Sequence, residues 1–211
     1  MRLIVTGGTG RLGRRVVMEA LSRNHTVTIL SRSPEAIDLA HPGLQRVSVN
    51  VRDQAALAEA VQGHDAVIST LGHRRAAEAP DLLSVGMANL IAAMEGAGIQ
   101  RIVALASAGI LQLDASRLRF ERAGYPEAFR AGSQAHLKAW EHLEASALDW
   151  TLVCPPELVE GDREALLSVQ ADYLPEGPLK VSMEALARWM IDALPDASCS
   201  RKRVGILSPT P

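Results

Sequence analysis

Thr6-Gly7-Gly8-Thr9-Gly10-Arg11-Leu12-Gly13 is the stretch that decides the fold. It follows an apolar, strand-like run and opens a helical pattern with apolar residues at Val16, Val17, Ala20 and Leu21. Glycines permit a tight turn, let backbone N–H groups approach a pyrophosphate, and allow helix and strand to pack closely. The helix N-terminus adds partial positive charge. The sequence therefore predicts a strand, turn and helix that bind a dinucleotide, rather than a purely structural turn.

Short β-branched runs alternate with helical patterns along the chain. The runs are Leu3 to Thr6, Thr26 to Leu30, Arg46 to Val49, Ala66 to Thr70, Ile102 to Ala106 and Thr151 to Cys154. Such alternation is typical of βαβ units in a parallel sheet. We therefore expect one α/β domain over residues 1–211, built as a Rossmann-type, doubly wound parallel sheet.

Three later helices follow from apolar spacing and capping residues. One is expected from Leu83 to Gly98 and another from Ser133 to Ser146, with Ser133 as its N-cap. Ser182 is a candidate cap for a final helix, and a last strand is expected near Val204 to Leu207.

Two stretches fall outside the alternation, Ile110 to Gly132 and Pro156 to Lys180. Each follows the carboxyl end of a predicted strand, the edge where ligands sit in open α/β folds. We interpret residues 110–132 and 156–180 as a substrate lid; the alternative is that they are ordinary surface excursions.

Composition limits the possible partners. The formal net charge of −2 does not favour nucleic acid, and no apolar run is long enough to span a membrane. Cys154 and Cys199 fit neither a disulfide framework nor a metal site, and no histidine has metal-ligand spacing. The first strand starts too early for a signal peptide. We expect a cytoplasmic monomer or small homo-oligomer that binds a small molecule and no metal.

The end of the second predicted strand distinguishes the two nicotinamide dinucleotides. NAD sites usually carry an acidic residue there, whereas an arginine accommodates the 2′-phosphate of NADP. Here the strand runs into Ser31-Arg32-Ser33, with no acid before Glu35. We therefore predict NADP(H), the alternative being that Arg32 is a solvated surface charge.

Two further segments carry a family resemblance: Gln100-Arg101-Ile102-Val103-Ala104-Leu105-Ala106-Ser107-Ala108-Gly109 and Leu148-Asp149-Trp150-Thr151-Leu152-Val153-Cys154-Pro155-Pro156. With the glycine turn, they resemble the atypical short-chain dehydrogenase/reductase group of NAD(P)H-binding, NmrA-like proteins. Within that group the chain is most similar to the biliverdin IXβ reductase, or flavin reductase, family. The likeness covers most of the chain and is weakest in the two long loops.

The resemblance implies a set of site residues. Gly10 to Gly13 would hold pyrophosphate, Arg32 the 2′-phosphate, and Asn50-Val51 the adenine, although Asn50 replaces the usual aspartate. The segment Leu71-Gly72-His73-Arg74 would lie beside the ribose and phosphates. Ser107 and His136 would lie near the nicotinamide as the catalytic candidates. The full cofactor-binding set is Gly7, Thr9, Gly10, Arg11, Leu12, Gly13, Ser31, Arg32, Ser33, Asn50, Val51, Leu71, Gly72, His73, Arg74 and Pro155.

The catalytic tyrosine of classical short-chain dehydrogenases is missing at its expected position. Counting back from Leu148 places their Tyr-x-x-x-Lys motif at Gly132 and His136. Without that phenol, alcohol or ketone chemistry is disfavoured, whereas acceptors that need little acid catalysis remain possible. Ser107 is a candidate to hydrogen-bond nicotinamide or substrate, and His136 to donate a proton; the alternatives are a structural hydroxyl and a satisfied, half-buried histidine.

Aromatic and basic residues gather in the first long loop, at Arg117, Arg119, Phe120, Arg122, Tyr125, Phe129 and Arg130. They are suited to covering a flat, acidic, conjugated substrate, or else the aromatics pin the loop to the core. Our leading hypothesis is an NADPH-dependent reductase that acts on a flavin, biliverdin-like or quinone-like acceptor. Its rival is a non-catalytic NADP(H) sensor of the NmrA-like kind. An epimerase or dehydratase ranks lowest because it requires the missing tyrosine and lysine.

Overall fold

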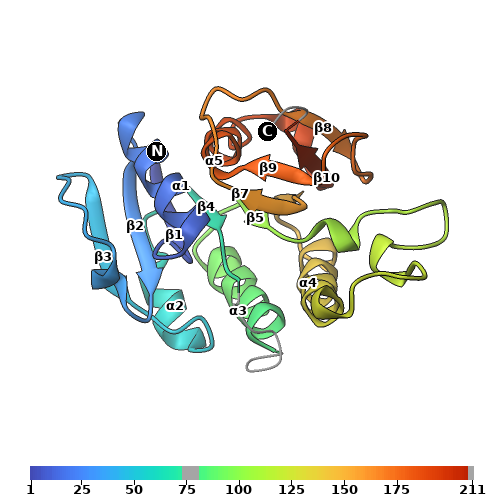
Figure 1. The fold of residues 1–211 in the computed structure, drawn as a ribbon. Helices are drawn as coiled ribbons and strands as arrows, with labels where there is room; N and C mark the ends of the chain where they lie inside the picture. Colours follow the sequence, from blue (N-terminus) through green and yellow to red (C-terminus); the bar gives the residue numbers. More distant parts are fainter. Residues whose placement is uncertain (73–80, 209–211) are drawn as a thin grey trace.

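The computed structural model describes residues 1–72 and 81–208, so the predicted site residues His73 and Arg74 lie outside the described part. An eight-stranded sheet forms the centre, in the order β3-β2-β1-β4-β5-β6-β10-β8 (Figure 1). All neighbouring strands are parallel except the edge pair β10 and β8. The strands are β1 (Arg2–Thr6), β2 (Thr26–Ser31), β3 (Leu44–Ser48), β4 (Ala66–Ser69), β5 (Arg101–Leu105), β6 (Asp149–Cys154), β8 (Ser168–Ala171) and β10 (Lys202–Leu207).

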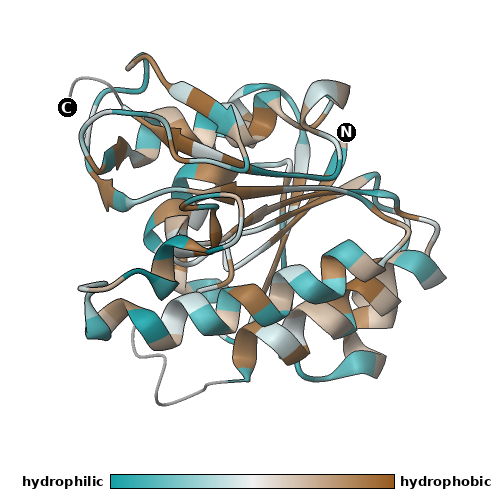
Figure 2. Ribbon diagram, turned by 90° about the vertical axis from the view of Figure 1, so that its right-hand side faces the viewer, coloured by the Kyte–Doolittle hydropathy of each residue, from teal (hydrophilic) through white to brown (hydrophobic). Residues whose placement is uncertain are grey.

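Helices cover both faces of the sheet. On one face lie α1 (Arg11–Ser22) and α5 (Met183–Asp192), which pack together; on the other lie α2 (Gln54–Ala60), α3 (Leu82–Gly96) and α4 (Glu127–Ala145). The central strands are buried on both sides, which is why they consist of continuous apolar runs (Figure 2). This arrangement confirms the predicted single, doubly wound Rossmann-type domain.

The helix predicted from Ser133 begins earlier than expected. Helix α4 starts at Glu127 with Pro126 at its N-cap, so the first long loop ends there and Ser133 is not a cap. Ser133 lies inside the helix and is fully buried. Its hydroxyl bonds to another side chain, Tyr125, instead of to a free N–H at a helix end. Local propensity for capping was therefore outweighed by a tertiary contact.

The C-terminal predictions were confirmed. The hydroxyl of Ser182 accepts a hydrogen bond from the N–H of Ala185 at the start of α5, and the last strand is β10. The segment from 156 to 180 contains more regular structure than expected. It holds β7 (Glu157–Val159), which pairs with β9 (Lys180–Ser182), and the edge strand β8.

Ion pairs attach that segment to the face formed by α1 and α5. Glu19, 7% exposed on α1, accepts hydrogen bonds at 2.7 and 2.9 Å from Arg163, and one at 2.8 Å from Arg23. These bonds, that from Arg163 foremost, hold the pKa of Glu19 below its usual value despite burial. Because Arg163 comes from the segment and Glu19 from α1, this cluster couples the segment to the domain.

Two features bear on the environment of the chain. None of the described helices combines the length and the apolar character that a membrane crossing requires. Both Cys154 and Cys199 are buried and unpaired. Burial raises the pKa of the Cys154 thiol, so that side chain behaves as part of the core.

Candidate functional site

The sheet order gathers the predicted site residues along one edge. Strands β2, β1, β4, β5 and β6 are parallel neighbours, so the residues that follow them lie at the same carboxyl edge. The chain leaves β1 toward β2 and β3 on one side, and returns to β4 on the other. This switch point next to β1 is where open α/β sheets bind ligands, and the glycine turn lies there.

Steric contacts explain the glycines of the turn. Gly7 has φ +73°, and a Cβ there would lie 2.6 Å from the carbonyl oxygen of Thr70. A Cβ at Gly13 would lie 2.2 Å from the carbonyl oxygen of Gly7. The N–H of Gly10 donates to that same oxygen at 2.9 Å. Leu12, 4% exposed, anchors the helix start in the core.

The start of α1 is suited to an anion. Gly10 is its N-cap and provides no side-chain cap, and the first turn contains no acidic residue. The first N–H groups of the helix therefore keep their partial positive charge for a ligand. Arg11, exposed at the first position of the helix, has a guanidinium with no hydrogen bond or ion pair to the residues that the structure describes.

Thr70 shapes the turn and was not among the predicted site residues. Its N–H and its hydroxyl both donate to the carbonyl oxygen of Thr6, at 2.9 and 3.0 Å. Thr70 is buried, and its own carbonyl oxygen faces Gly7. The sequence held no signal for this role, because the contact joins the ends of two strands far apart in the chain.

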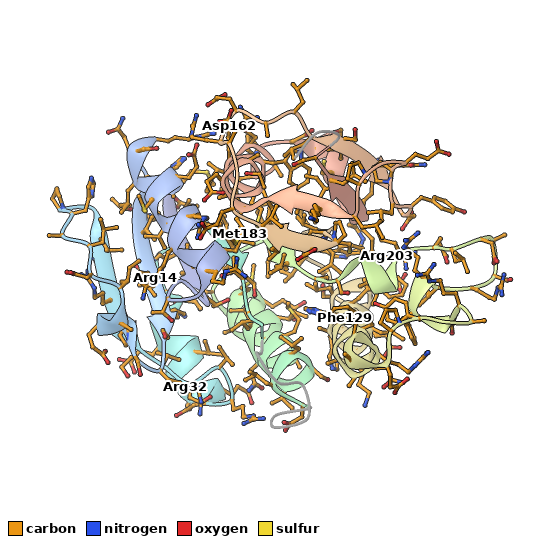
Figure 3. All side chains as sticks on the ribbon, in the orientation of Figure 1. Arg14, Arg32, Phe129, Asp162, Met183 and Arg203 are labelled. Carbon is orange, nitrogen blue, oxygen red and sulfur yellow. The ribbon has the colours of Figure 1, made fainter. Side chains whose placement is uncertain are left out.

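The residues after β2 form a small polar cluster. The hydroxyls of Thr9 and Ser31 lie 3.4 Å apart, and the N–H of Ser33 donates to Ser31 at 3.3 Å. Arg32 lies at the surface (Figure 3), and its guanidinium makes no hydrogen bond or ion pair within residues 1–72 and 81–208. The cluster therefore presents an exposed guanidinium, a group able to bind a phosphate through two hydrogen bonds, next to two hydroxyls.

The segment after β3 is fixed by α3. Asn50 is exposed, and its side-chain oxygen accepts the N–H of Arg52 at 3.1 Å, while Val51 is 7% exposed. The carbonyl of Val51 accepts a hydrogen bond at 3.1 Å from the side chain of Asn89 on α3. Leu71 and Gly72 follow β4, half-buried and exposed respectively. The loop predicted to face adenine thus has a fixed backbone.

Ser107 and Pro155 meet at the ends of β5 and β6. The N–H of Ala108 donates to the carbonyl of Pro155 at 3.0 Å. The hydroxyl of Ser107 accepts the N–H of Gly109 at 3.1 Å and lies 3.5 Å from the hydroxyl of Ser133 on α4. His136 follows three residues later on α4 and is half-buried, so it lies on the same side of the helix as Ser133.

The arginines of the loop before α4 and of the first turn of α4 divide into two groups. Arg117 is paired with Asp114 at 2.6 Å, and its hydrogen bond holds the pKa of that carboxyl at about 2. Arg130 donates to the carbonyl of Phe120 at 2.7 Å and pairs with the side chain of Glu127 at 2.9 Å.

Arg119 and Arg122 differ from these two. The structure gives neither side chain a hydrogen bond or ion pair to any residue it describes. Burial, and the like charge of Arg122, lower the pKa of Arg119. The aromatic residues also divide: Phe120 is buried and pins the loop, whereas Phe129 is 64% exposed (Figure 3). The loop thus has both an anchor and two free cations.

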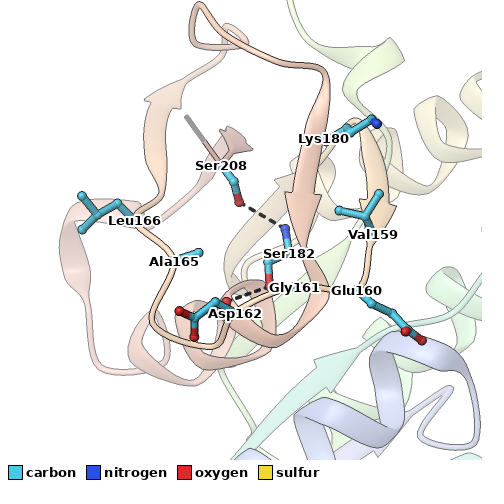
Figure 4. A pocket seen from close by; sticks show the side chains of 9 residues that line it. All are labelled: Val159, Glu160, Gly161, Asp162, Ala165, Leu166, Lys180, Ser182 and Ser208. Atoms are coloured by element: carbon cyan, nitrogen blue, oxygen red, sulfur yellow. Dashed lines mark hydrogen bonds between the residues drawn. The ribbon is translucent and has the colours of Figure 1, made fainter. Parts of the chain in front are cut away.

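A cavity of about 400 Å³ opens on the opposite side of β7 and β9 from α4 (Figure 4). Its wall consists of residues 159–162, Ala165, Leu166, Lys180, Ser182 and Ser208. The hydroxyl of Ser182 donates to the carbonyl of Asp162 at 2.9 Å, and that of Ser208 accepts the N–H of Ser182 at 3.1 Å. None of the predicted catalytic or cofactor residues lines this cavity.

Comparison with known proteins identifies the family. Residues 7–197 match the protein family described as NAD(P)H-binding. The chain belongs to this NAD(P)H-binding family. Membership confirms the prediction made from the glycine turn, namely that the domain binds a nicotinamide dinucleotide.

One relative of this NAD(P)H-binding chain is named as an assembly factor. The chain is 38% identical over 110 residues to the photosystem II assembly factor Ycf39 of a Synechocystis species. That match covers 49% of this chain and only 32% of the relative, so the chain spans about a third of that protein's length.

Solved structures match over nearly the whole chain. A Burkholderia pseudomallei protein, provisionally described as exported, superposes with a TM-score of 0.86 at 27% identity, covering 98% of this chain and 99% of that one. A Streptococcus pneumoniae protein, provisionally described as an NADH-flavin reductase, has a TM-score of 0.81 at 21% identity, with 99% of each chain covered. At that identity the second likeness supports the fold alone.

Proposed function

We propose that this chain is an NADPH-dependent oxidoreductase that reduces a flat, conjugated acceptor of the flavin, biliverdin-like or quinone-like class. When bound, the cofactor supplies the hydride, and the protein aligns the two rings. The observation that carries the proposal is the position of four guanidinium groups that have no hydrogen bond or ion pair to the described residues. Arg11 and Arg32 flank the glycine turn, and Arg119 and Arg122 lie on the loop after β5. Arg11, Arg32 and Arg122 are exposed and available to an anion, whereas Arg119 is half-buried, so that an anionic ligand would offset the cost of its burial.

The first pair supports NADP(H) as the cofactor. The glycines leave room for a pyrophosphate against the N-terminus of α1, and Arg32 with Ser31 and Ser33 offers several donors to a 2′-phosphate. No acidic side chain occupies positions 31 to 34, where an NAD-specific site would place one.

The second pair supports an acidic acceptor at the lid formed by residues 110–132 and 156–180. Arg119 and Arg122 suit a phosphate or carboxylate, such as FMN or the propionates of biliverdin carry, while Ser107 would contact the reacting rings. The flavin-reductase description of one structural neighbour agrees with this class. We also propose that the chain is related to the biliverdin IXβ reductase family. Its glycine turn and the strand ends at Ser107 and Pro155 resemble those of that family.

A second candidate function is a non-catalytic NADP(H) sensor. The relative Ycf39 is named an assembly factor, and the tyrosine expected at position 132 is a glycine here. A sensor would need the bound dinucleotide to alter a surface seen by a partner, without a productive acceptor site at Ser107.

Oxidation of NADPH, measured with FMN, biliverdin and a quinone as acceptors, tests the proposal. We expect turnover with at least one of them and tighter binding of NADPH than of NADH in a calorimetric titration. A protein that binds NADPH tightly but oxidises it with none of the three acceptors would support the sensor. Failure to prefer NADPH would overturn the role given to Arg32.

A further inference from the structure

Three hydroxyl groups form a chain from Ser107 to the surface. The hydroxyl of Tyr125 lies 2.9 Å from that of Ser133, which in turn lies 3.5 Å from that of Ser107. Ser133 is completely buried, whereas Ser107 and Tyr125 are each half-buried. This row of three hydroxyls therefore has a buried middle member and is partly accessible to solvent at both ends. A hydroxyl both donates and accepts, so such a chain can pass a proton without any member becoming charged for long.

The packing around the hydroxyls of Ser133 and Tyr125 leaves no space for a side chain at Gly109. A Cβ at Gly109 would lie 2.2 Å from the hydroxyl oxygen of Ser133 and 2.7 Å from that of Tyr125. Only glycine at that position lets the loop approach α4 this closely. The N–H of Gly109 also donates to Ser107 at 3.1 Å, which directs the serine hydroxyl. The short turn at Gly109 thus positions the hydroxyls of both Ser107 and Ser133.

Tyr125 places a phenol next to the position where the sequence lacks the expected tyrosine. The phenol expected at position 132 is absent, yet the hydroxyl of Tyr125, seven positions earlier, contacts Ser133, the residue after Gly132. Two cations lie near the phenol, and one of them, Arg130, is itself paired with Glu127. The guanidinium carbon of Arg130 lies 5.8 Å from the ring centroid, and Arg119 interacts electrostatically with Tyr125.

We propose that Tyr125, Ser133 and Ser107 form a proton relay that serves the acceptor site, with Tyr125 and Ser133 acting as positioning residues behind Ser107. The inference rests on the proposed function. The acceptor, which takes up hydride, also gains a proton from the hydroxyl of Ser107. Ser107 is reprotonated by Ser133, Ser133 by Tyr125, and Tyr125 by water, so the net donor is solvent. The step of 3.5 Å would tighten when ligands bind, as catalytic hydrogen bonds often do.

The relay is tested with Tyr125→Phe, Ser133→Ala and the double variant, in NADPH oxidation with FMN from pH 6 to 9. We expect each single variant to have a lower kcat, within the roughly 10² to 10⁴-fold range of general acid catalysis. The kcat of each variant should also fall more steeply than that of the wild type as pH rises. The double variant should be no worse than either single one, because both break the same chain. Tm and the Kd for NADPH should stay near the wild-type values.

Tyr173, the other tyrosine, lies in the lid and forms a bridge with Gln112 on the loop after β5, so it cannot serve as the control for turnover. The control is Ser22→Ala. Ser22 ends α1, and its hydroxyl donates to the carbonyl of Glu19 at 2.9 Å. This variant should keep wild-type kcat.

A second measurement does not depend on turnover. In the Tyr173→Phe background the absorbance of tyrosinate reports Tyr125 alone, and Ser107→Ala should shift its titration through the chain. If the wild type reduces FMN but both single variants keep its kcat and pH profile, the relay is overturned and the proposed function stands. If the wild type reduces no acceptor, the proposed function is overturned. An unchanged tyrosinate titration in Ser107→Ala shows that the hydroxyls are not coupled and overturns the relay in either case.

Discussion

The backbone of Gly13 packs directly on the carbonyl group of Gly7, and a Cβ at position 13 would lie 2.2 Å from that oxygen. We expect Gly13→Ala to push α1 away from the turn, lowering affinity for NADPH at least tenfold and lowering Tm. Gly96→Ala is the control, because Gly96 ends α3 with nothing within 4 Å of its added Cβ. That variant should bind NADPH normally. Equal affinity of Gly13→Ala and wild type would show that the turn does not require close packing.

Arg32→Ala should separate the two dinucleotides. Its free guanidinium would bind the 2′-phosphate, which only NADP(H) carries. We expect a loss of about 1.5 to 3 kcal/mol for NADPH, the usual value of a hydrogen bond to a charged group, and almost none for NADH. Calorimetric titration of both ligands measures this. Equal losses for the two would show that Arg32 does not contact the 2′-phosphate.

Substitutions at Ser107 and His136 should rank in a definite order. Ser107→Leu places a bulky side chain where the acceptor ring must approach to roughly 3 to 3.5 Å, so flavin reduction should be abolished while NADPH still binds. His136→Ala should lower kcat by at most about 10² to 10⁴-fold. Single-turnover measurements of NADPH oxidation give both values. A reversed order would make His136, instead of the relay, the main proton source.

Arg119→Ala should reduce affinity for acidic acceptors specifically. Because Arg119 has no counterion in the part of the chain that the structure describes, its loss should raise the KM for FMN by about tenfold or more, as expected for one charged hydrogen bond. The KM for a neutral quinone should not change. Lys138→Ala, which removes an exposed cation on α4, is the control. A parallel rise for the quinone would indicate that Arg119 shapes the loop and does not bind an anion.

Glu19 should make the stability of the domain depend on pH. The hydrogen bond from Arg163 leads the causes that hold the folded-state pKa of Glu19 below its unfolded value. Its contribution is therefore complete above the unfolded pKa and is lost as pH falls through the folded one. We expect Glu19→Gln to cost about 2 kcal/mol at pH 7 and less below pH 4.

Urea unfolding at several pH values measures this effect. Glu95→Gln, at an exposed carboxylate on α3, should leave the free energy of unfolding unchanged. A Glu19→Gln deficit that stays constant with pH would show that the ion cluster does not control acid stability.

The order of elements and the dinucleotide turn could be predicted from local signals. Apolar runs of strand length, glycines after the first run and a hydroxyl cap at Ser182 each act over a few residues, so their meaning does not depend on distant contacts. The same locality explains the error at α4. Ser133 is a residue type that often caps helices, but its hydroxyl is hydrogen-bonded to that of Tyr125, and the helix starts at Glu127 instead.

What the sequence by itself determined is therefore the fold class and, from the glycine turn, a domain that binds a nicotinamide dinucleotide. Only the tertiary structure decided which side chains are satisfied. Arg117 and Arg119 look alike in the sequence, yet one is paired with Asp114 and the other has no counterion among residues 1–72 and 81–208. The structure also decided that Thr70 faces Gly7 and that Tyr125 reaches Ser107 through Ser133. These relationships join residues on different elements, and a hydrogen bond depends on distances of tenths of an ångström that only the packed domain sets.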